Sequence, residues 1–98
     1  MILSAVQQEK QRIDRMLESY FQEKEKLPKG SLSEKRVGKR TYYYLKYRDG
    51  KKVVSQYIPA EMAGQIREQV EHRRHIEAMI QSLFEEQMIA QRILEEYI

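Results

Sequence analysis

Apolar residues that recur every seven positions in the first 27 residues constrain the fold of this chain most strongly. Two interleaved rows share the spacing, one apolar and one half apolar: Val6, Ile13, Tyr20 and Leu27, and Leu3, Lys10, Leu17 and Lys24. Such spacing places both rows along one narrow seam of an α-helix, as in coiled coils. Residues 1–27 contain no glycine or proline, and Pro28 and Gly30 then end the pattern. The sequence therefore predicts a long first helix over 1–27.

A second long helix is predicted over residues 59–98. Pro59 suits an early helical position, and Gly64 is the only residue after it that disfavours a helix. Its apolar stripe widens toward the C-terminus, which requires more than one neighbouring helix to cover it. We expect antiparallel pairing with the first helix and packing of the C-terminal half against another protomer. The expected oligomer interface consists of Ile80, Leu83, Phe84, Ile89 and Leu94.

Residues 31–58 between the helices predict a three-stranded antiparallel meander. Tyrosine, valine and threonine, which suit pleated surfaces, dominate 41–47 and 53–58. Two-residue turns are expected at Gly38-Lys39, with Val37 opposite Arg40, and at Asp49-Gly50, with Arg48 opposite Lys51. The fold class is therefore α+β: helix, meander and helix in a single domain over 1–98, with an antiparallel coiled-coil stalk and the sheet at its tip.

Register and alternation assign the strand residues to two faces. The predicted pairs include Leu45 with Val54, Tyr43 with Gln56, and Tyr42 with Tyr57. The expected inner face carries Leu32, Tyr43, Leu45, Tyr47, Val54 and Ile58. The expected outer face carries Lys35, Tyr42, Tyr44, Lys46, Arg48, Lys51, Val53, Ser55 and Tyr57.

Charge is concentrated in the same region. The net charge is only +3, yet residues 29–52 hold nine basic and two acidic residues, which leaves −4 on the rest of the chain. Cations for phosphates beside tyrosine rings are typical of nucleic-acid surfaces. The predicted contact residues are Lys35, Lys39, Arg40, Tyr42, Tyr44, Lys46, Arg48, Lys51 and Tyr57. The plainer interpretation is that these tyrosines are ordinary cross-strand aromatics, with cations that protect an exposed sheet from aggregation.

Little in the chain indicates catalysis or a bound cofactor. There is no cysteine, glycine-rich phosphate loop or nucleophile elbow. His72 and His75 lie three residues apart, but spacing fixes no third metal ligand for them. Arg67 and His72 share a spacing with the ribonuclease motif of the HEPN family, a resemblance of two residues. We expect a non-enzymatic cytoplasmic protein with no cofactor, no metal and no membrane segment.

Two resemblances bear on the family. One is to small uncharacterised bacterial proteins of Gram-positive bacteria and their mobile elements, through Leu27-Pro28-Lys29-Gly30-Ser31-Leu32, Gly38-Lys39, Tyr42-Tyr43-Tyr44-Leu45, Gly50-Lys51-Lys52-Val53 and Tyr57-Ile58. More loosely, a three-stranded sheet followed by a helix is similar to the arm-DNA-binding domains of tyrosine recombinases. That second resemblance implies DNA contacts at Lys35, Tyr42, Tyr44, Lys46 and Tyr57.

These observations lead to two functional hypotheses. The first is a nucleic-acid-binding module, for DNA, that uses the outer sheet face and regulates a mobile element or defence system. The alternative is a coiled-coil protein-interaction or antitoxin-like assembly module that acts through the second helix. Both are compatible with a homodimer, and the second also implies a protein partner.

Overall fold

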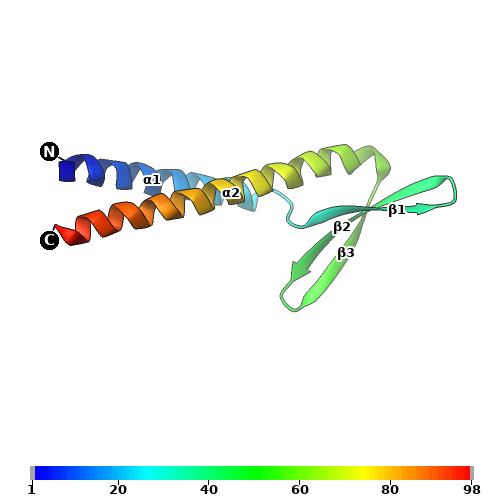
Figure 1. Ribbon diagram of the computed structural model, residues 1–98. Helices are drawn as coiled ribbons and strands as arrows, with labels where there is room; N and C mark the ends of the chain where they lie inside the picture. Colours follow the sequence, from blue (N-terminus) through cyan, green and yellow to red (C-terminus); the bar gives the residue numbers. More distant parts are fainter. Residues whose placement is uncertain (1, 98) are drawn as a thin grey trace. The chain divides into compact units, whose positions relative to one another are not determined.

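The computed structural model describes residues 2–97 and confirms the α+β fold (Figure 1). The elements follow one another as α1 (Ile2–Glu25), β1 (Ser31–Val37), β2 (Arg40–Asp49), β3 (Lys52–Ile58) and α2 (Ala60–Glu96). The three strands form one antiparallel sheet in the order β1-β2-β3. Neither helix contains a stretch long and apolar enough to cross a bilayer, as far as the described residues extend.

The chain divides into two compact units, although α2 runs through both as one helix. The first, here called the helical unit, comprises Met1–Lys26 and His75–Ile98. The second, here called the sheet unit, comprises Leu27–Arg74. Each unit has its own packing and is described in turn.

Within the helical unit, α1 and the last part of α2 lie side by side and run antiparallel (Figure 1). Three contacts show that the helices are antiparallel, because residues later in α1 contact residues earlier in α2. Gln87 donates a hydrogen bond to Asp14 at 2.5 Å, the rings of Phe21 and Phe84 lie 5.9 Å apart, and Lys24 lies 3.9 Å from Glu77.

The predicted seam of α1 is its least exposed stripe. Ile13 and Leu17 are buried, and the other members of both heptad rows that fall within α1 are half-buried. On α2, the buried residues of this unit are Ile76, Ile80, Leu83 and Ala90. Lys10, a polar member of the seam, forms an ion pair with Asp14 at 3.3 Å. The imperfect row of the heptad pattern is therefore accommodated by a local charge pair.

The sheet unit packs its inner face on the first turns of α2. Leu45 and Ile58 of the sheet and Val70 of α2 form the buried cluster, and Ile66 packs against it. The partly buried sheet residues around it are Leu32, Tyr43 and Tyr47. This is the inner face expected from the alternation of the strands. The N-terminal part of α2 covers it.

Gly30 is required by the geometry of the connection between α1 and β1. Its φ is +107°, and a Cβ added there would overlap the backbone oxygen of Lys46 and lie 2.9 Å from the Cβ of Tyr47. Only glycine combines this conformation with such a close backbone approach. Two α2 arginines also hold the connection, since Arg73 donates to the Leu27 carbonyl at 2.6 Å and Arg74 to the Gly30 carbonyl at 3.4 Å.

The two hairpin turns test the predicted register. The first is as expected, with Val37 opposite Arg40. The second prediction is wrong, because Asp49 pairs with Lys52 and the turn residues are Gly50 and Lys51. Gly38 and Gly50 have positive φ, and between residues 2 and 97 no residue other than glycine does. A positive φ at the first central position alone is the requirement of a type II′ turn, so Asp49 avoids a left-handed conformation.

Candidate nucleic-acid interface

The outer face of the sheet is set by alternation along the three strands. Despite the shifted second turn, every residue stays on its predicted face, because the register changes by an even number of positions and side chains alternate with period two. Lys51 is the exception, since it lies in the turn and not on a strand. The outer face therefore consists of Ser31, Ser33, Lys35, Val37, Arg40, Tyr42, Tyr44, Lys46, Arg48, Val53, Ser55 and Tyr57.

Cross-strand partners on this face differ from the prediction. Tyr57 lies opposite Tyr44 and not Tyr42, while Leu45 faces Gln56 and Tyr43 faces Ile58 on the inner side. The cause is the two-residue shift at the Gly50-Lys51 turn. As a result, three tyrosines gather in the middle of the outer face.

The three tyrosines form a packed cluster, here called the tyrosine cluster: Tyr42, Tyr44 and Tyr57. The Tyr44 and Tyr57 rings meet edge to face, with centroids 5.9 Å apart and planes at 69°. Tyr42 and Tyr57 are tilted at 51° with centroids 6.5 Å apart. Tyr42 and Tyr44 are half-buried, whereas Tyr57 keeps 54% of its surface exposed. Each ring therefore contacts another ring, and Tyr57 contacts two.

Six cations surround the tyrosine cluster, all of them exposed. Four lie on strands of the outer face, namely Lys35, Arg40, Lys46 and Arg48, and two lie in the hairpin turns, namely Lys39 and Lys51. Throughout residues 2–97, no ion pair joins any of these six to a carboxylate. Their charge is therefore available to an anionic partner.

A shallow hollow on this face was not anticipated from the sequence. It has a volume of about 440 Å³ and is lined by Ser33, Glu34, Lys35, Tyr44, Lys46 and Ser55. The Ser33 hydroxyl lies 3.4 Å from the Tyr44 carbonyl and donates to it across the strands. Strand alternation already places Ser33 and Ser55 on the outer face. Two serines alone do not indicate a hollow or a binding site, so the sequence did not predict one here.

Two other cations in the sheet unit have intramolecular partners. Arg67 of α2 pairs with Glu34 of β1 at 2.7 Å, and Lys29 lies 5.7 Å from the centre of the Tyr47 ring. His72 and His75 are both exposed on α2. In the part of the chain that the structure describes, no group of three histidine or acidic side chains could hold a metal ion.

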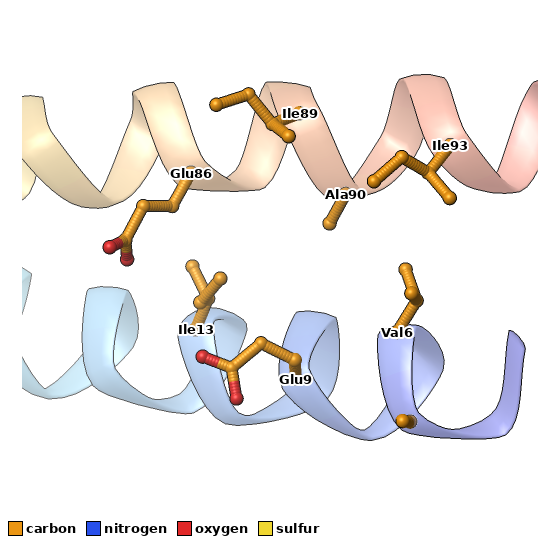
Figure 2. Close-up of a pocket in the computed structure, with 8 residues that line it drawn as sticks. Val6, Glu9, Ile13, Glu86, Ile89, Ala90 and Ile93 are labelled. Carbon is orange, nitrogen blue, oxygen red and sulfur yellow. The ribbon is translucent and has the colours of Figure 1, made fainter. Parts of the chain in front are cut away.

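The helical unit contains a different kind of surface, an apolar groove of about 380 Å³ between α1 and α2 (Figure 2). Its lining is Ala5, Val6, Glu9, Ile13, Glu86, Ile89, Ala90 and Ile93. Figure 2 shows Val6 and Ile13 pointing toward α2. A hydrogen bond from Arg12 lowers the pKa of Glu9 at the rim. Acidic and apolar side chains thus share this groove.

The predicted oligomer residues divide between two environments. Ile80 and Leu83 are 6% and 4% exposed, and Leu94 is half-buried, so these three are already largely covered within one chain. Phe84 and Ile89 keep 38% and 60% of their surface exposed. Only the latter two offer a partner substantial apolar area.

Fold and site together define a small α+β protein with a basic, tyrosine-rich sheet surface. The chain belongs to the family described as Domain of unknown function (DUF6788), which matches residues 2–68. The matched segment includes α1, all three strands and the first turns of α2, and hence the whole outer face. No curated protein and no solved structure matches the chain.

Proposed function

We propose that this protein binds nucleic acid, and specifically DNA, through the outer face of its sheet, and that it is not an enzyme. The observation that supports this most directly is the set of six exposed cations without carboxylate partners around the tyrosine cluster. A phosphate backbone supplies the missing anions in a row.

The dimensions of the sheet favour B-form DNA. Three strands at a spacing of about 4.8 Å span roughly 10 Å from the first strand to the third. The major groove of B-DNA is about 12 Å wide and admits β-ribbons, whereas that of A-form RNA is too narrow for side chains to read. The loose resemblance to the arm-DNA-binding domains agrees with this choice. A cytoplasmic role in regulating a mobile element or defence system is part of the proposal.

The direct test is a fluorescence-anisotropy titration of the purified protein with labelled mixed-sequence duplex DNA at low and near-physiological salt. We expect affinity to fall steeply with salt, because bound cations release counterions from the phosphates. Lys46→Glu should reduce affinity by about 10-fold or more without unfolding the sheet, since Lys46 is exposed.

Arg15→Glu provides the matched control. It makes the same change of charge on an exposed position of α1, outside the sheet unit. If both variants lose affinity equally, net charge and not the outer face governs binding. Absence of binding by the unmodified protein at low salt would refute the proposed function.

A second candidate function, self-association through the helical unit, rests on a separate observation. Ile89 lies at the apolar groove and is 60% exposed, and Met88 beside it is 63% exposed. A homodimer that paired two helical units into a bundle with coiled-coil packing would cover such side chains. This assembly and DNA binding use different units, so both can hold.

The oligomeric state is measured by size-exclusion chromatography with light scattering. We expect a dimer that Ile89→Glu dissociates, because a charge would be buried in the interface. Gln81→Glu, at an exposed position of the same helix, should leave the dimer intact. A monomeric unmodified protein at high concentration would exclude this second function.

A further inference from the structure

The tyrosine cluster indicates which form of nucleic acid the outer face would accept. Proteins that bind single strands present open aromatic rings on which successive bases stack. Such stacking requires a ring face that is free and accessible. The geometry of the three tyrosines can therefore distinguish a surface for unpaired bases from a surface for a duplex.

The rings of the cluster pack against one another, and two of them, Tyr42 and Tyr44, are half-buried. Tyr57 contacts both other rings, with centroids at 5.9 and 6.5 Å, and the planes are tilted by 69° and 51°. Edge-to-face contacts of this kind place the edge of one ring against the face of the next. Tyr57 packs against both Tyr42 and Tyr44, so a base that stacked on either ring would compete with these contacts.

The orientation of strand side chains determines what the rings present outward. Side chains stand roughly perpendicular to a sheet. The hydroxyl at the far end of a tyrosine that stands upright on the outer face is therefore the group nearest to a docked ligand. Hydroxyls donate to phosphate oxygens and to base edges in a groove, and they require no unstacked base.

The cations of the outer face are distributed along β2. Arg40 lies at the start of this strand and Arg48 near its end, with the tyrosine cluster between them. Eight residues at about 3.4 Å each separate the two arginines by roughly 27 Å. Lys39 and Lys51 extend the charge at the two turns. A sheet that lies lengthwise in a groove brings these cations along the phosphate backbones at its border.

We propose, on the basis of the function above, that the outer face binds duplex DNA in preference to single strands and that the hydroxyls of Tyr42, Tyr44 and Tyr57 contact it directly. In this arrangement the rings hold the hydroxyls in position by packing on one another. The lysines and arginines at both ends bind the phosphate backbones.

The test compares a 20-base-pair duplex with a 20-nucleotide single strand free of self-complementarity, both by fluorescence anisotropy at near-physiological salt. The triple variant Tyr42→Phe, Tyr44→Phe, Tyr57→Phe removes the hydroxyls and keeps the rings. We expect the unmodified protein to prefer the duplex by 10-fold or more and the triple variant to lose about 10-fold on the duplex. Circular dichroism verifies that the variant retains its fold.

Other outcomes overturn the inference in recognisable ways. One such outcome is that the single strand binds as tightly as the duplex or more tightly, and that the triple phenylalanine variant keeps full affinity. This result would show that the rings stack on bases. It would refute the duplex preference but leave the proposed nucleic-acid function intact. A duplex preference with no loss in the triple variant would refute direct hydroxyl contacts. Failure of either oligonucleotide to bind at low salt would refute the proposed function itself.

Discussion

The sheet unit and the helical unit differ in how their charges are used. The sheet unit has twelve basic and five acidic residues, for a net charge of +7, whereas the helical unit has six basic and ten acidic residues, for −4. In the described part of the chain, three of the six cations of the helical unit form ion pairs with carboxylates: Lys10 with Asp14, Arg12 with Glu9, and Lys24 with Glu77. The excess of cations on the sheet unit is what makes its surface suitable for an anionic ligand.

The two units also differ in their cores. Within residues 2–97, ten apolar residues are buried, six in the helical unit and four in the sheet unit, and each set includes one alanine. A small core leaves the sheet unit more dependent on backbone geometry, in particular on the connection at Gly30. This difference can be tested by substitutions matched between the units.

The largest effect is expected for Gly30→Ala. The added Cβ would overlap the backbone of Lys46, and alanine tolerates the φ of +107° poorly, so we expect a loss of about 4 kcal/mol in the free energy of unfolding. Gly64→Ala on α2 is the matched control, since its Cβ would meet no atom within 4 Å. It should stabilise the protein by about 0.5 to 1 kcal/mol. Urea denaturation measures the free energy of unfolding of both variants. Equal changes in the two would contradict the roles assigned to Gly30 and Gly64.

Ile13→Ala should have the next largest effect, in the helical unit. Ile13 is 1% exposed, and truncation of a buried isoleucine costs about 3 kcal/mol. Hydrogen exchange should show reduced protection of α1 amides and unchanged protection in β2, because the units pack separately. Uniform loss of protection in both units would show that they unfold as one.

A smaller effect involves the pKa of Asp14. The hydrogen bond from Gln87, with help from Lys10, lowers this pKa below its ordinary value of 3.8. A lowered folded-state pKa stabilises the protein at pH values above the ordinary pKa, and this stabilisation is lost as pH falls through the folded-state value. We therefore expect the unmodified protein to have a higher melting temperature than the Asp14→Asn variant at pH 6. This difference should shrink below about pH 3. A difference that persisted at pH 2 would contradict this.

The sequence predicted the elements and the faces because both depend on local periodicity. Heptad spacing identified the seam around Ile13 and Leu17, and strand alternation assigned the outer face. The predicted faces are correct although the predicted turn at Asp49-Gly50 is wrong, because a register shift of two positions preserves alternation. The correct turn could have been found from the sequence, since Gly38-Lys39 and Gly50-Lys51 repeat the same pair in equivalent positions.

Contacts between segments distant in sequence could not be predicted in this way. Arg67 pairs with Glu34, which lies 33 residues earlier in the chain. That choice depends on how α2 packs on the inner face, which periodicity does not specify. The tilt of the tyrosine rings and the unpaired state of the outer cations likewise follow only from the folded sheet.

The Arg67 and Glu34 pair provides the smallest and final test of the comparison. Both side chains are about half exposed, at 48% and 53%, so solvent screens the pair. A double-mutant cycle with Arg67→Ala and Glu34→Ala should give a coupling of only about 0.2 to 1 kcal/mol, which decreases in high salt. The same cycle on Lys10 and Asp14 should give a similar value. A much larger coupling for Arg67 would mean that this contact, and not the small apolar core, holds α2 on the sheet, and the dependence of the sheet unit on Gly30 would need another explanation.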